Sequence, residues 1–124
     1  MPAGIVIYTG NILPLFDFYM NALSFSECDR DEGYALLQHG DCELVLMETE
    51  IARLAGASTQ PPTPREAVAI KPVFFLDVTL ESLRAGIIQF GGHLQEPKSW
   101  QFDGRTVCDG YDCDGNVFQL RTKG

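Results

Sequence analysis

The stretch Asp112-Cys113-Asp114-Gly115-Asn116-Val117-Phe118-Gln119-Leu120 combines a tight turn with a strand. Its Asp-Gly pair is a turn former, because glycine adopts the positive φ that such a turn requires, and the asparagine after it tolerates a similar geometry. The strand that follows alternates between two faces, with Phe118 and Leu120 on one and Val117, Gln119 and Arg121 on the other. The stretch therefore predicts a turn that leads into a strand with two chemically different faces.

The first half of the chain has a recognisable order of elements. The apolar run at 5–8 predicts a buried strand, and Asn11 is placed as the N-cap of a helix whose apolar face runs from Ile12 to Leu23. Two strands are predicted at 34–38 and 43–47, joined by the turn signal Gly40-Asp41, and a short strand at 26–30 precedes them.

The second half repeats this order after a segment rich in proline. Residues 56–64 hold three prolines among small polar residues, which predicts a linker or mobile loop. A buried strand follows at 73–76, then a helix capped by Thr79 and ended by Gly91-Gly92, and then strands around 93–95, 105–108 and 117–121. We predict a single domain over 1–124, with a first βαβββ module at 1–55, a linker at 56–71 and a second βαβββ module at 72–124.

Each half has a sheet face that it cannot bury alone. Placed side by side, the two halves let their helices cover one face and leave the other face curved around a cavity. The predicted fold class is thus α+β, with two βαβββ modules that form a curved mixed sheet around a cup and with helices on the outer face. Free sheet edges favour pairing between copies, so we expect a homodimer.

Composition limits the classes of function. The content of 45% apolar and 21% charged residues is typical of a globular domain. A net charge of −8 repels nucleic acid and anionic membranes and attracts a cationic ligand, although such a charge can also serve solubility alone. With neither a secretory signal nor a membrane span predicted, we expect a cytoplasmic protein whose four cysteines are inert thiols rather than disulfides or zinc ligands.

Three segments resemble the vicinal oxygen chelate superfamily, which includes glyoxalase I, extradiol dioxygenases, fosfomycin-modifying enzymes and bleomycin-binding proteins. Residues 18–25 (FYMNALSF) are similar to its first-helix exit FYxxxLGF, and residues 112–120 (DCDGNVFQL) look like its closing phrase DPDGNxxEL. The second helix exit is matched by Gly91-Gly92-His93-Leu94 through Pro97. The resemblance covers nearly the whole chain and implies the fold of a small bleomycin-resistance-type protein, but it says little about function.

Metal-dependent members of the superfamily hold a divalent ion with four His, Glu or Gln side chains, two from each half. Alignment by motif places Gly4, Pro72 and either Val45 or Met47 at three of these positions, and none of these residues offers a suitable donor. Only Gln119, at the fourth position, could coordinate an ion. We therefore predict no metal, no other cofactor and no catalytic residue.

In the superfamily, the strand face that carries Gln119 lines the cup. Strand parity, together with the loops that could form a rim, predicts an apolar and aromatic lining with a few polar groups, as small-molecule pockets have. The alternative is that several of these residues simply fill the core. The predicted ligand-binding residues are Val6, Tyr8, Met47, Phe74, Leu76, Trp100, Phe102, Tyr111, Gln119 and Arg121.

Three functions remain open. The first is a metal-free small-molecule-binding protein that sequesters an aromatic or cationic compound. The second is a metal-dependent lyase or isomerase similar to glyoxalase I, or a transferase similar to the fosfomycin-resistance enzymes. An enzyme would need a general base, for which Glu48 is a weak candidate. The third is a protein-interaction subunit whose cup is filled by its own side chains.

Overall fold

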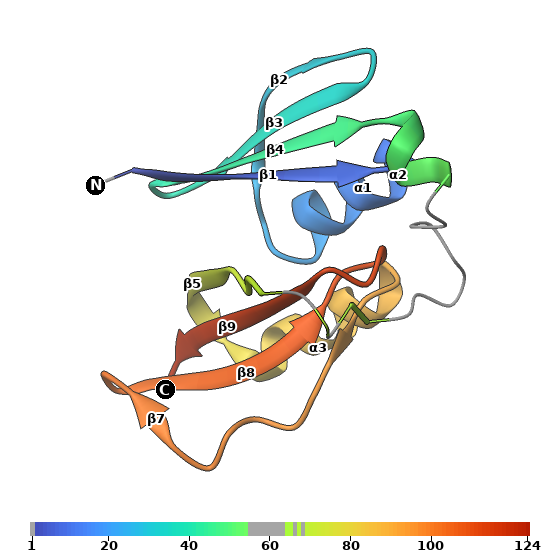
Figure 1. The fold of residues 1–124 in the computed structure, drawn as a ribbon. Coiled ribbons are helices and arrows are strands. Elements are labelled where there is room, and N and C mark those ends of the chain that lie inside the picture. Colours follow the sequence, from blue (N-terminus) through green and yellow to red (C-terminus); the bar gives the residue numbers. More distant parts are fainter. Residues whose placement is uncertain (1, 55–63, 66, 68) are drawn as a thin grey trace.

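The computed structural model describes residues 2–54, 64–65, 67 and 69–124. The order of elements predicted for the two halves is present in it (Figure 1). The first half contains β1 (Ala3–Thr9), α1 (Ile12–Asn21), β2 (Ser26–Asp31), β3 (Tyr34–His39) and β4 (Cys42–Glu48). The second contains β5 (Val73–Thr79), α3 (Leu80–Gln89), β6 (His93–Leu94), β8 (Arg105–Tyr111) and β9 (Val117–Lys123). The α+β class is therefore confirmed.

Two short elements were not predicted from the sequence. The helix α2 (Glu50–Leu54) follows β4, and the strand β7 (Gln101–Phe102) forms a hairpin with the start of β8. The predicted linker at 56–71 lies mostly outside the described residues, so only its last part can be compared with the structure.

Each half forms its own mixed sheet. The strand orders are β1-β4-β3-β2 and β5-β9-β8-β6, with β7 also paired to β8. In both sheets the first strand of the half lies parallel to the last one, and the other pairings are antiparallel. Figure 1 shows β1 and β5 at the edges where the two sheets face each other. The repeat is thus one of topology as well as of element order.

The two halves share a single buried core. Helix α1 belongs to the first half, yet the ring of Phe18 lies 6.2 Å from that of Phe118 on β9, and the ring of Tyr19 lies 6.1 Å from that of Phe74 on β5. One apolar cluster accordingly contains residues of α1 and α3 and of both sheets. Because apolar burial is the main favourable term in folding, this shared cluster holds the halves together.

The helix starts were predicted with mixed success. Thr79 caps α3 as expected, since its Oγ1 accepts a hydrogen bond from the Ser82 N–H at 3.3 Å. Asn11 occupies the N-cap position of α1, but its side chain makes no capping hydrogen bond. The carboxylate of Glu48 accepts the Ile12 N–H at 3.1 Å instead. An anionic group at this end of the helix also complements the helix dipole.

The turn at 112–116 fastens the second half to the first. Asp112 accepts hydrogen bonds from the backbone N–H groups of Asp114 and Asn116, at 2.9 and 3.0 Å, and from the Tyr19 hydroxyl of α1 at 2.7 Å. The Thr9 hydroxyl at the end of β1 donates to the carboxylate of Asp114. Burial raises the pKa of Asp112 to about 6, although its hydrogen bonds with Tyr19 and Asn116 oppose that rise. The turn residues therefore have a structural role in joining the two halves.

Candidate functional site

The face of β9 that points away from the core carries the candidate site. Phe118 and Leu120 are fully buried, whereas Val117, Gln119 and Arg121 are half-buried, so the predicted alternation of this strand is confirmed. We call this exposed side of the second sheet, with Phe75 and Asp109 from the neighbouring strands, the cup face.

The strand next to β9 presents different residues from those predicted. The parallel register pairs Val73 with Gln119, Phe74 with Leu120 and Phe75 with Arg121. Partners in register point to the same side of a sheet, so Phe74 and Leu76 belong with the core, where they are 3% and 2% exposed. The prediction that they face the cup was wrong by one residue, and Phe75 occupies that face instead.

Asp109 lies at the centre of a polar network on the cup face. Its carboxylate accepts hydrogen bonds from Lys71 Nζ at 3.1 Å and from Gln119 Nε2 at 3.1 Å, and Lys98 Nζ lies 3.3 Å away. Burial by itself would raise the pKa of Asp109, but the hydrogen bonds from Gln119 and Lys71 outweigh it and hold that pKa below its ordinary value. Asp109 is thus a carboxylate that binds two ammonium groups, both through Oδ2.

Arg121 lies beside this network and stacks on aromatic rings. Its guanidinium carbon is 4.4 Å from the ring centre of Phe102 and 5.5 Å from that of Phe75. Its Nε donates to Gln119 Oε1 at 3.2 Å. Cation–π contacts and the hydrogen bond together hold the guanidinium in one orientation.

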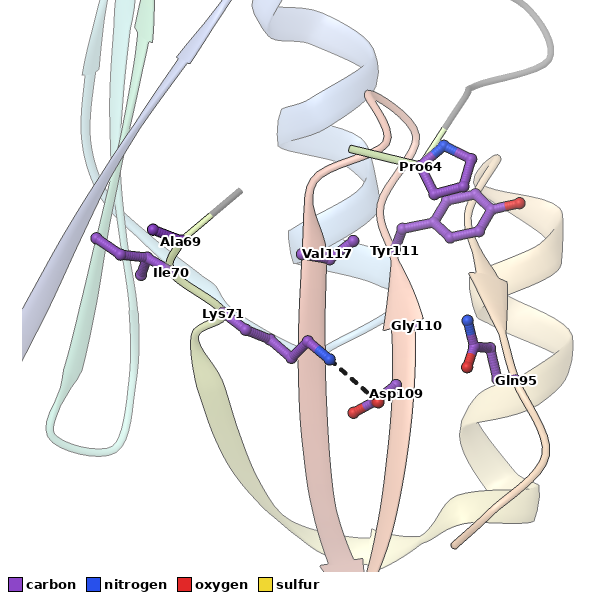
Figure 2. Close-up of a pocket in the computed structure, with 9 residues that line it drawn as sticks. All are labelled: Pro64, Ala69, Ile70, Lys71, Gln95, Asp109, Gly110, Tyr111 and Val117. Carbon is purple, nitrogen blue, oxygen red and sulfur yellow. Dashed lines mark hydrogen bonds and ion pairs between the residues drawn. The ribbon is translucent and has the colours of Figure 1, made fainter. Parts of the chain in front are cut away.

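Two cavities lie at the end of this face where β9 begins. Figure 2 shows one of about 460 Å³, in which Lys71 reaches across β9 towards Asp109. A second, of about 410 Å³, opens between β1 and the start of β9. The first is lined by Pro64, Ala69, Ile70, Lys71, Gln95, Asp109, Gly110, Tyr111 and Val117. Ile70 and Val117 line both cavities, so the two are adjacent.

A third cavity, of about 460 Å³, lies between β1, the turn after β3, and β5. Phe75 lines it, and so does Phe74, which reaches it from the core. This cavity therefore lies beside the edges of β1 and β5.

The structure brings together several of the predicted ligand-binding residues. Val6 and Tyr8 line the 410 Å³ cavity together with Val117, and Tyr111 lines its neighbour. Gln119, Arg121 and Phe102 are linked by direct contacts. Met47 pairs with Tyr8 across the first sheet and so points to the same side as Tyr8, whereas Trp100 is 49% exposed and lies apart from the group. None of the three cavities is lined by Met47, Trp100, Phe102, Gln119 or Arg121.

Sequence reasoning missed four residues of the cup face: Phe75, Lys71, Lys98 and Asp109. Asp109 follows directly on the predicted strand 105–108, and extending that strand's alternation by one residue would have placed it beside Gln119. Lys71 fell in the predicted linker and Lys98 in a loop, where no periodicity indicates a partner.

The donors at the family's four metal positions do not fit a divalent ion. Gly4 and Pro72 have no donor side chain, and Val45 and Met47 offer no nitrogen or oxygen. Both amide atoms of Gln119 are engaged, one with Asp109 and one with Arg121. Within the described residues, no group of three or more His, Cys, Asp or Glu side chains could hold an ion.

Two linked βαβββ modules with a shared core define the fold. The chain has the fold of the vicinal oxygen chelate superfamily, as solved structures confirm. A glyoxalase/bleomycin resistance protein/dioxygenase family enzyme from Burkholderia phytofirmans superposes with a TM-score of 0.67 at 20% identity, over 96% of this chain and 95% of that one. The fosfomycin resistance protein FosX from Mesorhizobium loti gives 0.69 at 12% identity, over 100% and 92%.

A further similar structure is a bleomycin resistance determinant encoded on the transposon Tn5, with a TM-score of 0.60 at 20% identity over 99% of this chain and 98% of that one. No family profile and no curated protein sequence matches the chain. Among the described residues, no helix is long and apolar enough to cross a membrane.

Proposed function

We propose that this protein is a metal-free, small-molecule-binding protein that sequesters a planar aromatic compound on the cup face, and that it acts as a cytoplasmic homodimer. The observation that carries the proposal is the hydrogen bonding of Gln119, the one residue at the metal positions that could coordinate an ion. Its amide is engaged by Asp109 and Arg121. The adjacent cavities of about 460 and 410 Å³ lie within the size range of small-molecule pockets.

The charges around the cup favour an aromatic compound over a cationic one. The acidic excess of the chain is concentrated in residues 1–54, which hold nine acidic and two basic residues. Among the described residues of the cup face, by contrast, cations outnumber carboxylates: Lys71, Lys98, Arg105 and Arg121 accompany Asp77 and Asp109. A cation would be repelled there, whereas exposed rings such as Phe75 and Phe102 can stack on a planar molecule.

The enzyme alternative, a metal-dependent lyase, isomerase or transferase, has less support. It needs a proton-transfer group in the cup that is free to act. Asp109 is occupied by two ammonium groups and an amide, and Glu48 holds the first N–H of α1. The similarity to FosX and to the bleomycin resistance determinant concerns the fold and is compatible with either function.

Isothermal titration calorimetry against a panel of planar aromatic compounds tests the proposal. We expect saturable binding, one site per chain, that does not depend on added metal. Val117→Trp should abolish binding by filling the adjoining cavities, whereas Val78→Trp, at a position 42% exposed near the end of β5, should leave it unchanged. Absence of binding across the panel, or metal-dependent turnover of a methylglyoxal–glutathione adduct, would contradict the proposal.

A further inference from the structure

The terminal nitrogens of Arg121 have no partner within the described part of the chain. Its Nε is bound to Gln119, and no hydrogen bond or ion pair reaches Nη1 or Nη2 from any described residue. The neighbouring Arg105 differs in this respect, because its Nη2 lies 3.1 Å from Asp77 Oδ1. Arg121 is therefore a half-buried cation whose two outer donors are free of any described residue.

The surroundings of Arg121 leave its charge uncompensated. Asp109 is the nearest carboxylate of the network, but it already binds Lys71 and Lys98. On the same side of the sheet Arg105, which lies over the ring of Phe75, pairs with Asp77. Among the described residues of the cup face, four cations (Lys71, Lys98, Arg105 and Arg121) therefore stand against the two carboxylates of Asp77 and Asp109. Since a half-buried charge is screened less than an exposed one, an anionic group placed here is attracted strongly.

Arg121 is also held ready for such a group. Its contacts with Phe102 and Phe75 and its bond to Gln119 fix the plane of the guanidinium, so little side-chain entropy remains to be lost when an anion binds. A planar guanidinium with two free parallel donors matches a carboxylate or a phosphate. The rings of Phe75 and Phe102, each 54% exposed, offer a stacking surface next to it.

The geometry points to Arg121 as the anchor for the anionic group of a planar aromatic ligand, that is, an aromatic carboxylate or an aryl phosphate. This inference rests on the proposed binding function and deepens it by naming the class of ligand. In the bound state the anion accepts hydrogen bonds from Nη1 and Nη2, and the aromatic part packs against Phe102 or Phe75.

Calorimetric titration of the full chain with four matched probes tests the inference: naphthoate, naphthyl phosphate, neutral naphthamide and naphthylmethylammonium. We expect naphthoate or naphthyl phosphate to bind more tightly than naphthamide, and the cation to bind most weakly. Whichever anion binds better identifies the chemistry, and its affinity should fall as salt is added, while that of naphthamide should not.

Variants of Arg121 test the residue itself. Arg121→Gln should weaken binding of the better anion by about tenfold to a hundredfold, since hydrogen bonds to charged groups contribute about that much. Arg121→Lys should restore part of the loss, because it keeps the charge but not the paired donors. In both variants the affinity for naphthamide should stay within about twofold of wild type. Arg84→Gln, which removes a cation of α3 that pairs with Glu81, is the matched control and should bind all probes as wild type does.

The two levels of the proposal fail in different ways. If naphthamide binds as tightly as both anions, or if Arg121→Gln weakens all probes equally, the anion anchor is wrong and the binding function stands. If none of the four probes binds, both the anchor and the proposed binding function are contradicted.

Discussion

Replacing Tyr19 with phenylalanine removes one hydroxyl from the contact between α1 and the turn at 112–116. That hydroxyl donates to Asp112 Oδ2 at 2.7 Å, in a site where both residues are fully buried. A hydrogen bond to an ionised group contributes about 1.5–3 kcal/mol, and one between neutral groups about 0.5–1.5 kcal/mol. The cost of Tyr19→Phe therefore depends on whether Asp112 is charged.

The pH dependence follows from the pKa of Asp112. Burial raises this pKa from 3.8 to about 6 in the folded protein, so the folded state binds more protons than the unfolded state between these values. The contribution of Asp112 to stability is thus present in full below about pH 3.8 and is lost as the pH rises through about 6. The Tyr19 hydroxyl limits that loss because it favours the carboxylate. Removing the hydroxyl raises the pKa of Asp112 further, so the loss in free energy of unfolding, relative to wild type, grows with pH.

Urea unfolding of wild type and Tyr19→Phe at about pH 5 and about pH 7.5 measures the effect. We expect the free energy of unfolding of the variant to lie below that of wild type by about 1 kcal/mol at the lower pH and by about 2 kcal/mol at the higher one. Tyr34→Phe is the matched control, since its hydroxyl bonds Asp29 Oδ2 at 2.8 Å in exposed surroundings. That variant should stay within about 0.5 kcal/mol of wild type at both pH values. A Tyr19→Phe deficit that is constant or shrinks as the pH rises would refute the reasoning.

Three further outcomes are expected. Gly92→Ala should destabilise the protein by about 1–3 kcal/mol in urea unfolding, because the added methyl group overlaps the ring of Phe18. The methyl group of Gly4→Ala meets only ordinary contacts, so this control should cost little stability. Equal losses of stability in the two variants would contradict this reasoning. A thiol reagent should label the exposed Cys28 quickly in the native protein and Cys113 only on unfolding, since burial raises the pKa of the Cys113 thiol. Fast labelling of Cys113 in the native protein would be inconsistent with its burial. Added zinc, nickel or manganese should leave the unfolding temperature unchanged, and a metal-dependent rise would show that the donor analysis is wrong.

The parts of the fold that were predicted depend on local chemistry. Thr79 caps α3 through a residue three positions away, and β9 alternates clearly between apolar and polar residues. The run at 73–76 is apolar throughout, so its sequence does not indicate which side faces the core. That side is set by the parallel register with β9, a pairing between residues more than forty positions apart.

The candidate site was predicted less completely for the same reason. Gln119, Arg121 and Phe102 were identified, but their partners were not. The role of Asp109 as the centre of a polar network appears only in the folded chain, where Lys71 and Lys98 approach it from two separate segments. Likewise, Glu48 replaces Asn11 as the group that binds the start of α1, because the parallel pairing of β1 with β4 brings the end of β4 next to the helix.

The placement of α1 against strands of the other module has a consequence for the evolution and engineering of this chain. A separated N-terminal fragment would expose the rings that now meet Phe118 and Phe74, and a separated C-terminal fragment would lack the cover for those two phenylalanines. Although the halves look like duplicated units, their shared core predicts that neither folds alone. We expect that cutting the chain between them yields fragments that gain structure only when mixed.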